Sequence, residues 1–179
     1  MGRRAGRDLT RDRGRGDYPG LVLQFPLPAT WDRDGLADVG FLGFVPLIVL
    51  SPQTVPTGHG IYAVLRPDDQ APHSFIPHNP VNRSGAVHYT TETLVKRWVS
   101  GANVLYIGKA MGQEGLRDRL RPYSRKSSSH SGGRAIWQLS EADQLLVCWA
   151  ETPGLVPRSV ETEYLARFRQ TYGRLPFAN

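Results

Sequence analysis

The chain has 179 residues, enough for one domain with its own buried core and too few for two fused enzymes. Hydrophobic residues make up 40% of it and charged residues 21%, a composition typical of globular proteins, and its apolar stretches are too short to cross a membrane. A single cysteine, Cys148, excludes an internal disulfide and a Cys-rich zinc site, and the arginine-rich start lacks the apolar segment of a secretory signal. We therefore expect a cytoplasmic protein.

Residues 1–17 are predicted to be a disordered basic arm. The first 16 residues hold six arginines and two aspartates, and so carry four of the six excess positive charges of the chain. They offer almost nothing to bury against a core, which favours disorder. Two interpretations stay open: a solubilising tail, or an arm that binds nucleic acid.

Residues 18–55 are predicted to be a lead-in of short strands and turns that packs on the core. Apolar runs at 21–23, 41–45 and 47–50 have the length of strands, and five prolines interrupt the segment. We place the main domain at residues 56–179.

The first strand of this domain is expected at residues 60–66. Its apolar side chains fall on both faces, which indicates a central strand that is covered from both sides. Residues 67–90 have an irregular composition, and Thr91 is then expected to cap a short helix that ends at Gly101, with apolar positions 94, 95, 98 and 99 on one face.

A second strand at 104–107 precedes a short helix from about Glu114. Leu116 and Leu120 should face the core there, and Pro122 should stop the helix. A third strand is expected at 144–150, and a last helix should run to Tyr172, with Gly173 ending it in the left-handed conformation. These three strands suffice for a small sheet.

Several catalytic motifs are absent from the sequence. Gly108-Lys109 lacks the glycines of a phosphate-binding loop, and neither a Gly-x-Ser-x-Gly elbow nor a His-Glu-x-x-His helix occurs. The irregular spacing of His73, His78 and His88 favours surface histidines over metal ligands.

Five short elements follow one another in a familiar order. They are Gly60-Ile61-Tyr62, Tyr106-Ile107-Gly108-Lys109, Arg119-Leu120-Arg121-Pro122-Tyr123, Glu161 and a final Asn179 after a proline. In this order the sequence resembles the GIY-YIG nuclease superfamily, and its motif region is most similar to the nuclease domain of the excision-repair incision subunit. The resemblance covers roughly residues 56–179. It implies an α/β (α+β) fold with a small three-stranded, mostly antiparallel sheet flanked by helices, which agrees with the strands and helices expected above.

The sequence departs from the family pattern in two places. Between Tyr62 and Tyr106 lie 43 residues where the family usually has a short turn, so we interpret residues 67–101 as an insertion beside the site. Residues 111–113 or their neighbours lengthen the loop before the arginine-rich helix by about three residues relative to the family pattern.

The resemblance implies hydrolysis of a nucleic-acid phosphodiester with one divalent metal, Mg²⁺ or Mn²⁺. Glu161 is the expected ligand, since a carboxylate suits these cations and the residue shares a helix face with apolar side chains. Glu163 should lie on the opposite, polar face. Without the resemblance, Glu161 would be interpreted as a first-turn carboxylate that complements the helix dipole.

The arginines near the second tripeptide supply candidates for phosphate contact. Arg119 matches the family's helix arginine and could hold a phosphate in a bidentate manner, with Arg117 as the second choice and a solvated, helix-stabilising arginine as the alternative. Nucleic-acid contacts are expected from Arg117, Arg121, Arg125 and Arg134.

Tyr62 and Tyr106 are expected side by side across an antiparallel strand pair, where directly opposed side chains are ~5 Å apart. Tyr62 is the expected general base or water-orienting group, with a pKa lowered by Lys109 and the metal. Lys109 could instead contact phosphate or be a surface lysine. Two core tyrosines with satisfied hydroxyls are the alternative.

The remaining expected site residues are His130, for proton transfer on a Ser/Gly-rich loop, and three supporting residues, Gly60, Gly108 and Asn179. Together these features predict a metal-dependent endonuclease that cuts DNA, with RNA left open as the target instead. Two alternatives stay open: a catalytically idle nucleic-acid-binding module, and an enzyme on the same scaffold with a small phosphoester or other non-nucleic substrate.

Overall fold

A computed structural model of the protein describes residues 24–68, 70, 72–81, 88–125, 127 and 133–179. The predicted basic arm (1–17), the apolar run at 21–23 and His130 lie outside the described residues. Within the described part, no helix is both long enough and apolar enough to cross a membrane.

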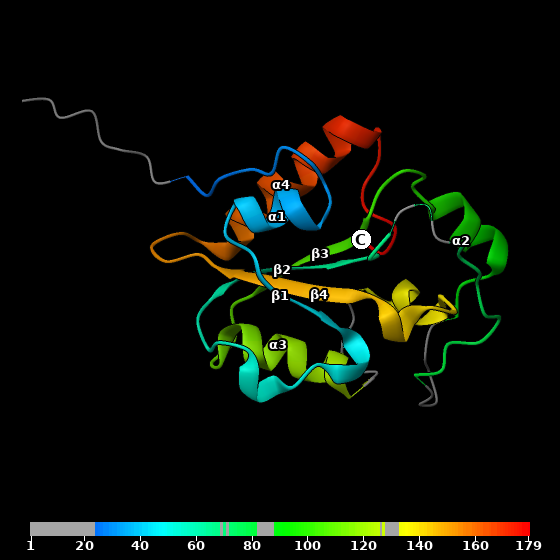
Figure 1. Ribbon diagram of the computed structural model, residues 1–179, viewed down its shortest axis with the longest axis horizontal. Coiled ribbons are helices and arrows are strands. Elements are labelled where there is room, and N and C mark those ends of the chain that lie inside the picture. Colours follow the sequence, from blue (N-terminus) through cyan, green and yellow to red (C-terminus); the bar gives the residue numbers. More distant parts are fainter. Residues whose placement is uncertain (1–23, 69, 71, 82–87, 126, 128–132) are drawn as a thin grey trace, which may run out of the picture.

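The centre of the fold is an antiparallel sheet whose strand order is β1-β4-β2-β3 (Figure 1). The strands are β1 (Leu42–Pro46), β2 (Gly60–Leu65), β3 (Val104–Ala110) and β4 (Leu146–Glu151). The described residues therefore form four strands and not the three expected, because the lead-in adds β1 alongside β4. The expectation that residues 60–66 form a central strand is confirmed, since β2 pairs with both β3 and β4.

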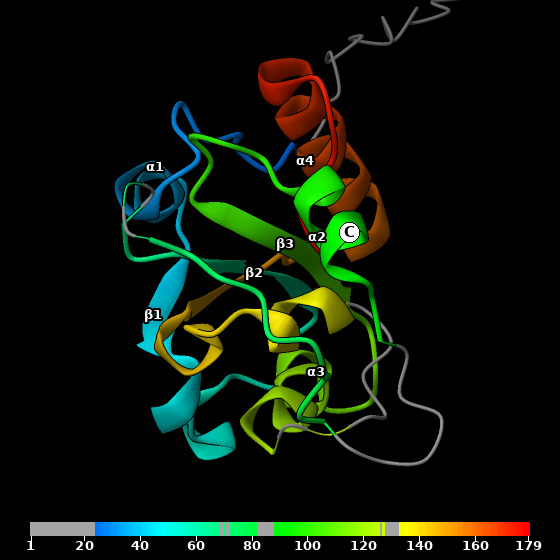
Figure 2. The same cartoon turned by 90° about the vertical axis from the view of Figure 1, so that its right-hand side faces the viewer.

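Helices cover both faces of this sheet. Helices α1 (Arg33–Asp38) and α4 (Pro157–Tyr172) lie on one face, α3 (Gly115–Ser124) lies on the other, and α2 (Thr91–Arg97) lies at one end (Figure 2). Alternate residues of a strand point to opposite faces. Tyr62 and Val64 accordingly join the core beneath α3, while Ile61 and Ala63 join the core beneath α4. The fold is thus an α/β arrangement with two buried cores.

The lead-in differs from the expectation in its second half. The apolar run 47–50 forms no strand: Leu47–Val49 is a 3₁₀ helix, a second one follows at Pro52–Thr54, and Ile48 and Val49 are exposed. Prolines 46 and 52 flank the run, and proline cannot donate a hydrogen bond to a sheet. Helix α1 was not expected from the sequence; its N-cap Asp32 accepts a hydrogen bond from the amide of Gly35.

Three helix ends lie elsewhere than predicted. Thr90, not Thr91, caps α2, and this helix ends at Arg97 with Val95 exposed. Helix α3 continues past Pro122 to Ser124, because Tyr123 is buried and packs against the rings of Tyr62 and Trp137. Packing of such a large ring outweighs the single hydrogen bond that a proline removes. Helix α4 ends as predicted at Tyr172, with Gly173 at φ 75°.

The described residues of the predicted insertion (67–101) gather around an aromatic cluster. Trp98 stacks on His73, with ring centroids 3.8 Å apart, and contacts the ring of Phe177, with centroids 5.3 Å apart. Phe75 forms an isolated bridge with Leu139 and stacks on Phe177. These contacts hold the segment against the C-terminal tail of the chain.

Candidate functional site

A pocket of about 450 Å³ opens beside β3, which is an edge strand of the sheet. Its lining combines side chains from both faces of the sheet. Lys109 of β3 and Glu161 of α4 come from the α4 side, and Arg119 of α3 and Tyr106 of β3 come from the α3 side. The pocket is completed by Met111, Gly112, Gly115 and Asp118.

Lys109 and Glu161 form an ion pair within this pocket. The side chain of Glu161 is 13% exposed and that of Lys109 is 32% exposed, so the pair is partly withdrawn from water. Glu163, two residues further along α4, accepts a hydrogen bond from Gln24 and lines a different pocket. Of the two glutamates, Glu161 alone lines the pocket beside β3.

The three arginines of α3 have different partners. Arg119 lines the pocket, and its Nε is buried without a hydrogen-bond partner among the described residues. Arg117 donates from Nε to the carbonyl of Val55 at 3.0 Å, and Arg121 forms an ion pair with Glu114 at 2.8 Å. A buried donor that lacks a partner is costly unless a ligand satisfies it. The geometry therefore selects Arg119, not Arg117, as the arginine available to a ligand.

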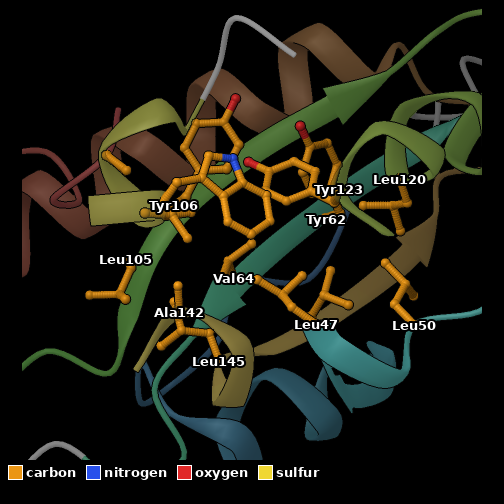
Figure 3. Close-up of a cluster of buried hydrophobic side chains, with 14 of the residues drawn as sticks. Leu47, Leu50, Tyr62, Val64, Leu105, Tyr106, Leu120, Tyr123, Ala142 and Leu145 are labelled. Atoms are coloured by element: carbon orange, nitrogen blue, oxygen red, sulfur yellow. The ribbon is translucent and has the colours of Figure 1, made fainter. Parts of the chain in front are cut away.

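The two motif tyrosines lie diagonally and not directly opposite each other. Tyr62 pairs in register with Gly108, and Tyr106 pairs with Val64. Diagonal neighbours of a strand pair still come within reach when the side chains are aromatic. The two ring centroids are 5.8 Å apart, and Tyr123 adds a third ring 6.0 Å from that of Tyr62 (Figure 3).

The burial of Tyr62 favours the protonated form of its hydroxyl, whereas the sequence predicts a lowered pKa. Its side chain is fully buried, and this burial, with the neighbouring Tyr123 and Tyr106, raises the pKa of Tyr62 well above its usual value despite the opposing charge of Arg119. Without bound metal, Arg119 lowers this pKa, but burial outweighs its effect. Lys109 does not contribute as expected, because it shares the face of β3 with Ile107, opposite to Tyr106, and pairs with Glu161. The effect of a bound metal on the pKa of Tyr62 stays a prediction.

Arg119 contacts the tyrosine cluster, by which we mean Tyr62, Tyr106 and Tyr123. Burial lowers its pKa, but a hydrogen bond with Tyr62 and attraction to Tyr62, Tyr106 and Tyr123 raise it, and the net direction is upward. Arg119 therefore stays a cation at neutral pH. The tyrosines orient this cation beside the pocket.

The predicted supporting residues have clear structural roles. Asn179 accepts a hydrogen bond from the amide of Ile107 at 2.9 Å and donates one to the carbonyl of the same residue at 2.7 Å. The final residue thus pairs with the open edge of β3. A Cβ atom at Gly60 would lie 2.1 Å from the carbonyl oxygen of Ala150, so only glycine permits this close strand approach.

The other predicted residues lie apart from the pocket. Arg125 is exposed at the end of α3, and Arg134 begins a 3₁₀ helix, where its carbonyl accepts a hydrogen bond from Asn79. His130 is outside the described residues. His73, His78 and His88 belong to no cluster of three or more metal-ligating side chains within the described part of the chain.

Sequence reasoning missed several residues of the pocket. Asp118 lines it, and its Oδ2 also accepts a hydrogen bond from the amide of Glu114 at 2.8 Å. Tyr123 belongs to the tyrosine cluster and lies four residues after Arg119, so it shares the inward face of α3 with that arginine. This helical spacing could have identified Tyr123, whereas no sequence signal singles out Met111 or Gly112.

Comparisons with known proteins add no relative: no protein-family model, no curated protein and no solved structure matches the chain.

Proposed function

We propose that the protein is a metal-dependent endonuclease of GIY-YIG type that hydrolyses phosphodiester bonds in DNA. One observation carries the proposal. Glu161, Lys109, Arg119 and Tyr106 come from α4, β3 and α3 and line a single pocket at the edge of the sheet. These residues supply a carboxylate for a metal, two cations for phosphate and a hydroxyl, which are the groups that phosphodiester hydrolysis requires.

The pocket fits a magnesium ion bound through one carboxylate. Mg²⁺ keeps several of its waters and is usually held by one or two carboxylates together with substrate phosphates. Glu161 is the carboxylate that would hold it, and Asp118 is a second carboxylate in the same lining. When bound, the ion would polarise a phosphoryl oxygen as a Lewis acid.

The cations of the pocket have separate tasks in this proposal. Arg119 offers its unpartnered Nε to the phosphoryl oxygens, where negative charge grows in the transition state. Lys109 neutralises Glu161 while no other cation is bound, and its ammonium becomes available to the substrate phosphate once a metal takes the carboxylate. A phosphate backbone therefore meets positive charge in both situations.

Tyr62 is a positioning residue in this proposal. With its pKa raised by burial, its hydroxyl stays protonated at neutral pH and cannot accept a proton from water. Its hydrogen bonds with Tyr106 and Arg119 fix these two side chains at the pocket. Tyr106 lines the pocket, so its hydroxyl is the one placed to orient an attacking water.

DNA is the proposed substrate and the cytoplasm the proposed location. The net charge of +6 suits a polyanionic partner. RNA presents the same phosphodiester chemistry and is therefore included in the test.

The experiment is incubation with supercoiled plasmid, single-stranded DNA and RNA, each with Mg²⁺ and with a chelator. We expect magnesium-dependent cleavage that Glu161→Gln abolishes while the fold and DNA binding survive. Glu163→Gln is the matched control, since this carboxylate lies on the same helix outside the pocket, and it should cut like the wild type. Absence of metal-dependent cleavage on all three substrates would overturn the proposal.

A catalytically idle nucleic-acid-binding module is the second candidate. The Lys109–Glu161 ion pair favours it, because a permanently paired carboxylate binds no metal. The same experiment separates the two candidates. An idle module would bind each substrate equally well with Mg²⁺ and with chelator, and would leave each intact.

A further inference from the structure

A second pocket, of about 340 Å³, lies at the C-terminal ends of α2 and α4. Among the described residues, its lining includes four cationic side chains and no aspartate or glutamate. The four are Lys96, Arg97, Arg169 and Arg174. We call these residues the basic pocket. Helix α2 and the C-terminal tail lie at the same end of the sheet in both views (Figure 1, Figure 2).

The cations of the basic pocket are held by contacts other than ion pairs with carboxylates. Arg174 donates to the carbonyl of Trp98 at 2.9 Å, and the guanidinium of Arg97 lies over the ring of Tyr89 at 4.5 Å. Lys96 and Arg169 are exposed. Within the described part of the chain, none of the four forms an ion pair with a carboxylate.

Helix dipoles account for part of this arrangement only. A cation in the last turn of a helix is stabilised by the partial negative charge there, which applies to Lys96 and Arg97 on α2 and to Arg169 on α4. Arg174 lies after the end of α4, so the helix dipole does not explain its position. Its hydrogen bond to the carbonyl of Trp98 holds it at the basic pocket. Four like charges around one hollow repel one another, and an anion in the hollow relieves that repulsion.

The basic pocket and the pocket of Glu161 lie along the same helix and the same strand. On α4, Arg169 of the basic pocket is eight residues after Glu161, a rise of roughly 12 Å. Asn179 lines the basic pocket and bonds to Ile107, while Lys109 lines the other pocket. Ile107 and Lys109 are two residues apart on one strand, a separation of roughly 7 Å. A nucleic-acid strand repeats its phosphates at short intervals, so one strand can place phosphates in both pockets.

We propose that the basic pocket binds the phosphate backbone of the nucleic acid beside the bond that is cut. The inference rests on the proposed function in one respect: the strand at the basic pocket is the strand that enters the pocket of Glu161. It also gives the insertion a role. Lys96 and Arg97 of the insertion line the basic pocket, and among the described residues of the insertion none lines the pocket of Glu161.

The test measures DNA affinity against salt concentration in chelator, so that no cleavage occurs. The variant is Lys96→Gln with Arg169→Gln, both exposed side chains whose loss should leave the fold intact. The matched control is Arg158→Gln with Arg167→Gln, which removes the same charge from exposed positions on α4 outside the basic pocket. For duplex DNA, we expect the slope of log affinity against log salt to fall by about 1.8 in the variant and little in the control.

A charge-retaining variant completes the design: Lys96→Arg with Arg169→Lys should keep the wild-type slope. An unchanged slope in the glutamine variant, or an equal fall in the control, would overturn the proposal. An acidic polypeptide that binds as tightly as DNA, and is lost in the same variant, would assign the basic pocket to an acidic protein and also overturn it.

The two proposals fail separately. If the wild type cuts no substrate with Mg²⁺ but the slope falls only in the glutamine variant, the proposed function is wrong, and the basic pocket stands as a phosphate-binding site with no cleaved bond beside it. If the wild type cuts and the slopes of variant and control are equal, the function stands and the basic pocket does not.

Discussion

Arg119 differs from Arg117 and Arg121 because it lines the pocket of Glu161 and because its buried Nε has no hydrogen-bond partner among the residues that the structure describes. Arg119→Ala should lower the single-turnover cleavage rate by a factor of about 10² or more, because a donor aimed at developing charge matters most in the transition state. Ground-state DNA affinity should change little. Arg121→Ala is the control, since Arg121 pairs with Glu114. Equal defects in the two variants would show that α3 contributes general positive charge only.

Tyr62 makes the stability of the protein depend on alkaline pH. Burial raises the pKa of its phenol above the value of about 10 that a tyrosine has in the unfolded chain. The stabilisation is therefore complete below pH ~10 and is lost as the pH rises, because the unfolded chain then releases a proton that the folded chain keeps. Between the pKa of the unfolded chain and that of the folded protein, this difference in one bound proton lowers the free energy of unfolding by about 1.4 kcal/mol for each unit of rising pH.

Denaturant unfolding of the wild type and Tyr62→Phe at several pH values above 9 measures this dependence. Tyr62→Phe should lose stability less steeply with pH than the wild type, whatever its stability at neutral pH. Parallel curves would contradict the buried, protonated state of Tyr62. They would reopen its role as a base.

At the scale of elements, the β2–β3 pair depends on Gly108. A Cβ atom at this position would lie 2.6 Å from the Cζ and hydroxyl oxygen of Tyr62, whose buried ring has no space to move. Gly108→Ala should lower the free energy of unfolding by about 1–3 kcal/mol. Gly112→Ala is the control, because its Cβ would meet only the side chain of Asp118, at 3.2 Å. Thermal melting should show a clearly larger loss at Gly108.

The sequence predicts the elements whose pattern is local. Strands β2 and β4 and helix α4 follow from apolar runs and from Gly173, with small errors at the ends. The lead-in was harder, because whether an apolar run becomes a strand depends on a partner far away in the chain. The run at 41–45 forms most of β1, which pairs with β4. The run at 47–50 is flanked by prolines and contains a 3₁₀ helix, not a strand.

Some features of the candidate site could be predicted from the sequence and others could not. The order of the motifs led to Glu161, Arg119 and Tyr106, and the structure brings all three to one pocket. The partner of Lys109 and the pKa of Tyr62 depend instead on which face of the sheet each side chain occupies. Strand register decides this, and a shift by one residue would exchange the faces.

At the scale of the whole molecule, the C-terminal tail divides the open edge of β3. The amide of Ala178 donates to the carbonyl of Leu105 at 2.8 Å, and Asn179 pairs with Ile107. The tail thus covers one half of the edge and leaves the other half, near Lys109, to the pocket of Glu161. Edge strands with unpaired backbone groups invite unwanted pairing with other chains, and such a cover prevents it.

Asn179 is the residue through which the tail can be tested. Its side-chain amide takes the place of a neighbouring strand, because it both accepts from and donates to Ile107. Asn179→Ala should lower the free energy of unfolding by roughly 1–3 kcal/mol, since it leaves two partly buried backbone groups of β3 without partners. Asn179→Asp keeps the acceptor and loses the donor. Hydrogen exchange at the amide of Ile107 separates the two variants: we expect rapid exchange in Asn179→Ala and retained protection in Asn179→Asp. Equal protection in the wild type and Asn179→Ala would show that the tail does not hold the edge of the sheet.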